Sequence, residues 1–119
     1  MSLPVVSEEM KAWSAALAGE VAGWPHVRTR TFFGFTALYR KKKIFALLPR
    51  SRGMETPNSL AFKLATKSAV VLARLERDSR ITSAKMQKTR WFTFEVSSND
   101  DLRDALHWLG QAYEAAGPE

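Results

Sequence analysis

The fold is decided by residues 27–48, which have the sequence VRTRTFFGFTALYRKKKIFALL. Over 27–39 aromatic and β-branched residues recur at alternate positions, which predicts one long β-strand. Gly34 inside that strand indicates a bulge or a close approach of another backbone segment. The four charged residues 40–43 interrupt the apolar pattern and predict a hairpin turn. The apolar run 44–48 then returns as a strand that we expect to be central and covered on both faces.

The flanking sequence predicts a sheet with helices packed against it. Apolar residues at three- and four-residue spacing predict helices over 7–22, over about 67–77 with Thr66 as the cap, and after Ser98 or Asn99. Further strands are expected at 60–64, at 91–96 and, in short form, at the start of the polar segment 79–90. We therefore predict a single α+β domain over residues 1–119. Its two layers are three helices and a mostly antiparallel sheet of four to five strands, in the order α-β-β-β-α-β-β-α.

The composition excludes several classes of site. The chain has 119 residues and no cysteine, so it can hold no disulfide, no thiolate metal site and no thiol nucleophile. Its two histidines are far apart in sequence, and we expect neither a metal nor a cofactor. No apolar run approaches the ~20 residues of a membrane span. The first residues lack the pattern of a secretion signal, so we expect a soluble, cytoplasmic protein.

Charge is segregated along the chain. The formal net charge is +6, but residues 28–90 hold 16 of the 18 lysines and arginines and three of the 12 acidic residues, a local charge of +13. The two flanks together carry −7. A segregated positive field attracts polyanions in a way that evenly mixed charge does not.

Two basic segments within this region are candidates for nucleic-acid contact. The candidate binding residues are Arg40, Lys41, Lys42, Lys43, Lys85, Lys88, Arg90 and Trp91. The first segment forms a hairpin tip that could reach a phosphate backbone, while the second leads from basic residues into an aromatic ring that could stack on a base. The alternatives are a lysine-rich turn that serves solubility, and a Trp91 that enters the core. We expect Phe32 and Phe33 in the core rather than on a binding surface.

Catalytic motifs are absent from the sequence. There is no phosphate-binding glycine loop and no nucleophile elbow. Asp100, Asp101 and Asp104 are accounted for by the start of the last helix, where the helix dipole favours anions. His26 is expected in a turn and His107 on the polar side of its helix. We therefore expect that the protein is not an enzyme, since neither histidine has a carboxylate or nucleophile nearby in sequence with which to carry out acid–base chemistry.

Several short motifs, in order, resemble a known family. They are Trp24-Pro25-His26-Val27, Phe33-Gly34, Leu38–Leu47, Leu60–Leu64 and Met86-Gln87-Lys88-Thr89-Arg90-Trp91. Together they resemble the MmcQ/YjbR-like domains, which are similar to the N-terminal domain of the competence regulator TfoX. The resemblance implies a compact α+β domain of the CyaY-like type. Members are described as DNA-binding proteins with a double wing of hairpins, many have no assigned function, and the family supplies no catalytic residues.

Two functions follow as hypotheses. The first is a non-enzymatic domain that binds DNA or another polyanion. The alternative is a module that binds a protein or a small acidic ligand through the sheet face and loop 49–59, because four tryptophans and seven phenylalanines exceed what so small a core can hide. An exposed aromatic patch would also allow a homodimer. A concave pocket lined by tryptophan and arginine favours the alternative, and an exposed basic ridge favours nucleic acid.

Overall fold

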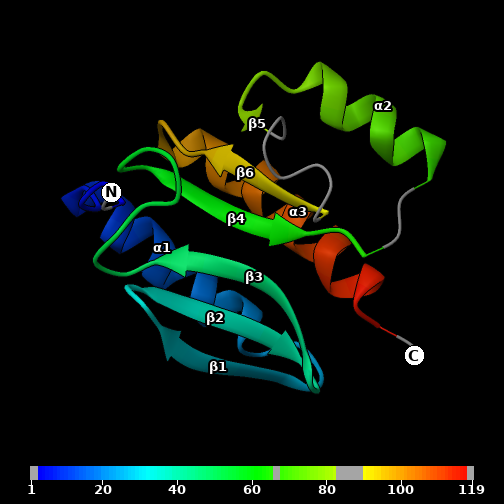
Figure 1. Ribbon diagram of the computed structural model, residues 1–119, viewed down its shortest axis with the longest axis horizontal. Helices are drawn as coiled ribbons and strands as arrows, with labels where there is room; N and C mark the ends of the chain where they lie inside the picture. The colour runs from blue at the N-terminus through cyan, green and yellow to red at the C-terminus, as the bar shows by residue number, and fades with distance from the viewer. Residues whose placement is uncertain (1–2, 66–67, 83–89, 118–119) are drawn as a thin grey trace.

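The computed structural model describes residues 3–65, 68–82 and 90–117 (Figure 1). Its elements are α1 (Glu8–Val21), β1 (Val27–Phe32), β2 (Phe35–Arg40), β3 (Lys43–Pro49), β4 (Ser59–Lys63), α2 (Ala69–Arg77), β5 (Ile81–Thr82), β6 (Trp91–Glu95), the short 3-10 turn η2 (Asn99–Asp101) and α3 (Leu102–Ala115). The strands form one antiparallel sheet in the order β1-β2-β3-β4-β6-β5. The α+β class and the three helices are confirmed, and the sheet has six strands rather than four to five.

The extra strand arises because residues 27–39 are two strands, so the prediction of one long strand is wrong. β1 and β2 meet at a two-residue turn, Phe33 and Gly34, which both have positive φ (46° and 91°). Such angles are typical of tight hairpins. The close approach expected at Gly34 is confirmed, since its carbonyl accepts the backbone N–H groups of 50–52 and an added Cβ would lie 2.9 Å from Arg52 Cγ.

The main core lies between the helices and one face of the sheet. Figure 1 shows α1 and α3 behind the sheet. Phe62 is fully buried there and stacks on both Phe92 and Trp108. Leu75 from α2 joins the same core, so all three helices serve one face. The cap of α2 is Ser68, whose hydroxyl accepts the N–H of Val71, and not Thr66 as expected.

The opposite face of the sheet carries a smaller apolar cluster. Its buried members are Phe35, Ala37, Leu47 and Ala61. None of the described helices contributes to this cluster. β3 therefore supplies buried side chains to both faces, which confirms its predicted central position.

Loop 50–58 closes one end of this second face. Thr93 Oγ1 donates to Glu55 Oε1 at 3.2 Å, and Thr56 Oγ1 donates to Glu95 Oε1 at 2.6 Å. These bonds hold the loop over the end at which β4 begins. Loop 50–58 does not cover the rest of this face, which lies over β1, β2 and the other end of β4.

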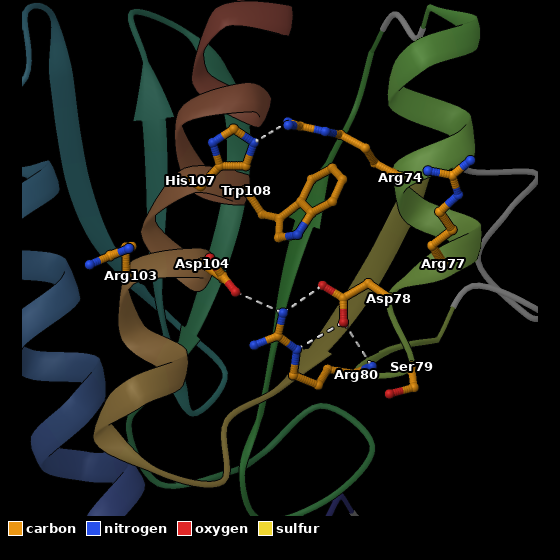
Figure 2. Close-up of a pocket in the computed structure, with 9 residues that line it drawn as sticks. All are labelled: Arg74, Arg77, Asp78, Ser79, Arg80, Arg103, Asp104, His107 and Trp108. Atoms are coloured by element: carbon orange, nitrogen blue, oxygen red, sulfur yellow. Dashed lines mark hydrogen bonds and ion pairs between the residues drawn. The ribbon is translucent and has the colours of Figure 1, made fainter.

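Arg80, between α2 and β5, ties the edge of the sheet to the start of α3. Its guanidinium donates to both carboxylate oxygens of Asp78 at 2.8 Å, and to Asp101 and Asp104 at 2.9 Å each (Figure 2). It also lies 4.8 Å from the centre of the Phe94 ring. Four charge-assisted bonds to three carboxylates make this the densest polar cluster among the described residues.

The contacts within this cluster shift the pKa values of its side chains. The hydrogen bond from Arg80 holds the pKa of Asp78 below its ordinary value. Burial raises the pKa of Asp101, but hydrogen bonds from the Ser97 N–H, from Arg80 and from the Ser98 N–H outweigh burial and leave that pKa lowered. The same Asp78 bond raises the pKa of Arg80. All three groups are therefore charged at neutral pH.

We predict that Arg80→Met destabilises the fold. Methionine keeps the contact with Phe94 but leaves three carboxylates without their cation. Because the Arg80 side chain is 29% exposed, the expected loss is about 2–3 kcal/mol, at or below the low end for a broken buried pair. Urea unfolding measures it. The exposed Arg77→Met is the control and should change stability by less than about 0.5 kcal/mol, and equal losses would contradict a special role for Arg80.

The lowered pKa values predict acid sensitivity. A carboxyl whose pKa is lower when folded adds stability above its unfolded pKa of about 3.9, and this stability is lost as the pH falls through the folded value. The stability gap between the native chain and Arg80→Met should therefore be constant above about pH 5 and narrow below about pH 4. Thermal melts of both chains across this range measure the gap. If the stability difference between the two chains stays the same at low pH, ionised Asp78 and Asp101 are not its source.

Candidate nucleic-acid interface

The lysines of the first basic segment form the β2–β3 turn. Arg40 pairs with Lys43 across the hairpin, so Lys41 and Lys42 are the turn itself, with Lys41 at φ 57°. All three lysines are exposed. The hairpin turn expected at 40–43 is therefore confirmed, and its lysines are exposed.

Arg40 is placed differently from the lysines. Its guanidinium lies 4.2 Å from the centre of the Tyr113 ring, donates to the Tyr113 carbonyl at 3.0 Å and is 4.0 Å from the Glu114 carboxylate. A cation on the last carbonyls of a helix offsets the negative end of the dipole. Arg40 thus fastens the C-terminal turn of α3 to the hairpin, and it also lines a pocket with Lys41, Lys42 and Lys43.

The second basic segment is described only from residue 90. Arg90 is exposed, and its guanidinium donates to the Ala65 carbonyl at 2.7 Å. Trp91 is half-buried on the second face, packed against the small cluster and opposite Lys63. It therefore does not enter the helix-side core. The candidates Lys85 and Lys88 lie outside the described residues.

Antiparallel pairing brings the two segments to one end of the sheet. β2 and β4 end there, and β3 and β6 begin there. The lysine turn, Lys63 and Arg90 therefore lie at the same end of the sheet. In Figure 1 these strand ends all lie at the right of the sheet. Two basic segments that are distant in sequence thus lie at one end of the sheet, although β3 pairs with β4 only at Ala46–Phe62 and Leu47–Ala61.

β1 adds a second set of cations and aromatic rings. Arg28, Arg30 and Phe32 pair with Tyr39, Ala37 and Phe35, so they lie on the second face. Directly opposite residues of an antiparallel pair share a face. The expectation that Phe32 and Phe33 are core residues is wrong, since they are 42% and 83% exposed. Their rings contact each other edge to face at 4.8 Å.

We call these side chains the cationic–aromatic face. It comprises Arg28, Arg30, Phe32, Tyr39, Lys63 and Trp91, with Phe33 at the β1–β2 turn. Sequence reasoning missed Arg28 and Arg30, although their alternation with Thr29 and Thr31 was a visible signal. The lysine turn lies at the end of the β2–β3 hairpin, where its three lysines line a pocket of about 440 Å³ together with His26, Arg40 and the two residues that follow α3, Ala116 and Gly117.

A concave pocket of about 620 Å³ lies on the other side of the molecule, between α2 and α3. Its walls include Arg74 and Arg77 from α2, and His107 and Trp108 from α3 (Figure 2). Arg74 Nη1 lies 3.1 Å from His107 Nε2. His107 is exposed, as expected. The sequence did not locate this pocket, but a pocket lined by tryptophan and arginine is the feature that favours the alternative function, a module that binds a small acidic ligand. The arginine pair three residues apart in α2 was the one local signal for it.

The described residues contain no group of three or more histidine and carboxylate side chains that could hold a metal ion. Within the same residues, no helix is both long and apolar enough to cross a membrane. Comparison of the chain with protein-family models, with curated proteins and with solved structures finds no match in any of the three. The resemblance to MmcQ/YjbR-like domains therefore rests on the sequence motifs.

Proposed function

We propose that this domain binds nucleic acid without catalysing a reaction, through the cationic–aromatic face and the lysine turn. One observation carries the proposal. On the sheet face that no described helix covers, cations and aromatic rings are interleaved, and they lead to a cluster of exposed lysines. Cations neutralise phosphates, and exposed rings give bases a surface on which to stack.

Single strands fit this surface better than duplexes. A sheet face is broad and cannot enter a groove, whereas unpaired bases can lie flat on its rings. Phe32, Arg30 and Arg28 follow one another along β1 toward the lysine turn, over about 13 Å at strand spacing. A strand of nucleic acid that follows β1 would meet first rings and then cations. Lys63 and Trp91 lie across the same face.

The acidic side chains of this face are held apart from its cations. Glu55 and Glu95 accept hydrogen bonds from Thr93 and Thr56 under loop 50–58, at the end where β4 begins. The lysine turn and Arg90 lie at the end where β4 finishes. The field over the proposed surface therefore stays positive, which favours a polyanion over a mixed-charge partner.

We also propose that the chain is related to the MmcQ/YjbR-like domains and that it is located in the cytoplasm. The α+β sheet with three helices is of the class that the MmcQ/YjbR-like resemblance implies, and the order of motifs supports that kinship. A cytoplasmic location is part of the same proposal, because nucleic acid is accessible there.

We predict that replacing Lys41, Lys42 and Lys43 with glutamine flattens the salt dependence of binding. If each lysine neutralises one phosphate, the slope of log K against log[salt] should fall by about 2.1 on single strands and about 2.7 on duplexes. Fluorescence anisotropy with a labelled oligothymidylate and a matched duplex measures both.

The matched control removes three cations elsewhere. Arg74, Arg77 and Arg103 lie on α2 and α3, and their replacement by glutamine changes the net charge by the same amount. The slope should then stay close to the native value. An equal fall in both variants would show attraction by net charge rather than by this surface. Absence of binding at tens of micromolar protein in low salt would end the proposal.

We also predict that Phe33→Asn weakens single-strand binding about fivefold or more, since one stacked base contributes about 1–3 kcal/mol. Asparagine tolerates the positive φ of this turn, so stability should hold. The control is Val70→Ala, which removes another exposed apolar side chain, on α2. Anisotropy titrations of the three chains measure the difference. Equal affinities for Phe33→Asn and the native chain would remove Phe33 from the surface.

A further inference from the structure

We infer that the pocket between α2 and α3 is a second binding site, for a small phosphorylated molecule with hydroxyl groups. The site is separate from the proposed nucleic-acid surface, because its walls belong to the helices that pack on the other face of the sheet. At about 620 Å³ it is of the size that takes a small organic ligand and is larger than a bare phosphate needs.

Both helices present arginines to this pocket, Arg74 and Arg77 from α2 and Arg103 from α3. Arg74 and Arg77, three residues apart, share one side of α2, since residues at that spacing are neighbours on a helix surface. Figure 2 shows Arg74 reaching from α2 toward His107 on α3. Its Nη1 lies 3.1 Å from the imidazole Nε2, so the two side chains bridge the pocket.

The carboxylates of the pocket do not balance these arginines. Asp78 gives both of its oxygens to Arg80, and Asp104 also accepts from Arg80. No described carboxylate forms an ion pair with Arg74 or Arg77. Like charges held together are unfavourable unless an anion joins them. The arginine wall formed by α2 is therefore available to an anionic group.

The donors select phosphate among anions. Each guanidinium offers a planar fork that matches the oxygens of a phosphate or carboxylate. Arg74 gives one N–H to His107 Nε2, and the remaining N–H groups of the two forks can be used more fully by the three terminal oxygens of a phosphomonoester than by the two oxygens of one carboxylate. A phosphomonoester thus satisfies the arginine wall better.

The opposite wall selects the rest of the ligand. Asp104 is half-exposed and bonds to Arg80 through Oδ2, so its other oxygen faces no donor among the described residues. A carboxylate oxygen accepts hydrogen bonds and recognises hydroxyl groups. Trp108, stacked on Phe62, makes the inner wall rigid. The ligand class is therefore a phosphorylated polyol or sugar, with phosphate toward α2 and hydroxyls toward Asp104.

The test titrates the full chain with inorganic phosphate, glycerol 3-phosphate and glycerol, each compared with sodium chloride at equal ionic strength. Two-dimensional ¹H–¹⁵N spectra should show saturable shifts confined to residues 74–80 and 103–108 for both phosphates, with tighter binding of the ester. Glycerol should cause none. Arg74→Gln with Arg77→Gln should weaken binding about tenfold or more, as lost charge-assisted bonds imply.

Controls separate this site from the nucleic-acid surface. Arg28→Gln with Arg30→Gln removes two cations from β1 and should leave the phosphate shifts unchanged, while the pocket variant should leave oligonucleotide binding unchanged. The spectrum of each variant reports its folding. The inference is overturned if phosphate and its ester shift the spectrum no more than chloride does, or if the pocket variant binds them as tightly as the native chain.

Discussion

The large core lies on one face of the sheet, against α1 and α3 and with Leu75 of α2 joining it, and the rest of the molecule follows from that constraint. The helix side holds the large core, in which Phe62 stacks between Phe92 and Trp108. The other side has only a small cluster around Phe35 and Leu47. A sheet covered on one side leaves alternate side chains of its strands exposed. The interleaved arginines and aromatic rings of the second face are such side chains.

Arg80 sets the second structural relationship, between α2 and α3. By bonding to Asp78 at one side and to Asp101 and Asp104 at the other, it fixes the end of α2 against the start of α3. The pocket between these helices is lined by Asp78, Arg80 and Asp104 of that junction. The same bonds occupy the nearby carboxylates and leave the arginines of α2 without counter-charges. Arg80 thus joins the two helices that line the pocket. It also occupies the carboxylates that would otherwise offset the positive charge of the α2 arginines.

The local sequence pattern predicted most of the helices and strands. It placed the residues of β1 on the wrong face of the sheet. Helix stripes, the apolar β3 and the lysine turn were all visible in sequence. The turn at Phe33 and Gly34 was not, because alternation continues through it without a polar break. A two-residue turn places Arg28, Arg30 and Phe32 opposite Phe35, Ala37 and Tyr39, whereas a continuous strand would put the two sets on opposite faces. Phe32 and Phe33 were expected in the core because aromatic side chains are usually buried, and the missed turn is what leaves them exposed.

The pocket could not be predicted for a different reason. Arg74 and His107 are 33 residues apart, and each is an ordinary exposed residue within its own helix. Arg74 and His107 come into contact only because α2 packs beside α3. No periodicity or spacing in the sequence encodes that packing. Sites built between elements become visible only with the three-dimensional arrangement.

The edge position of β1 gives the molecule an uneven mechanical character. Five of its six residues are exposed, and it pairs with β2 alone among the described strands. Detaching it uncovers little apolar surface, so it should open at a lower free energy than β3 or β4. One margin of the cationic–aromatic face can therefore adjust its shape to whatever lies on it. The margin formed by β4 and β6 is anchored to the core and keeps its geometry.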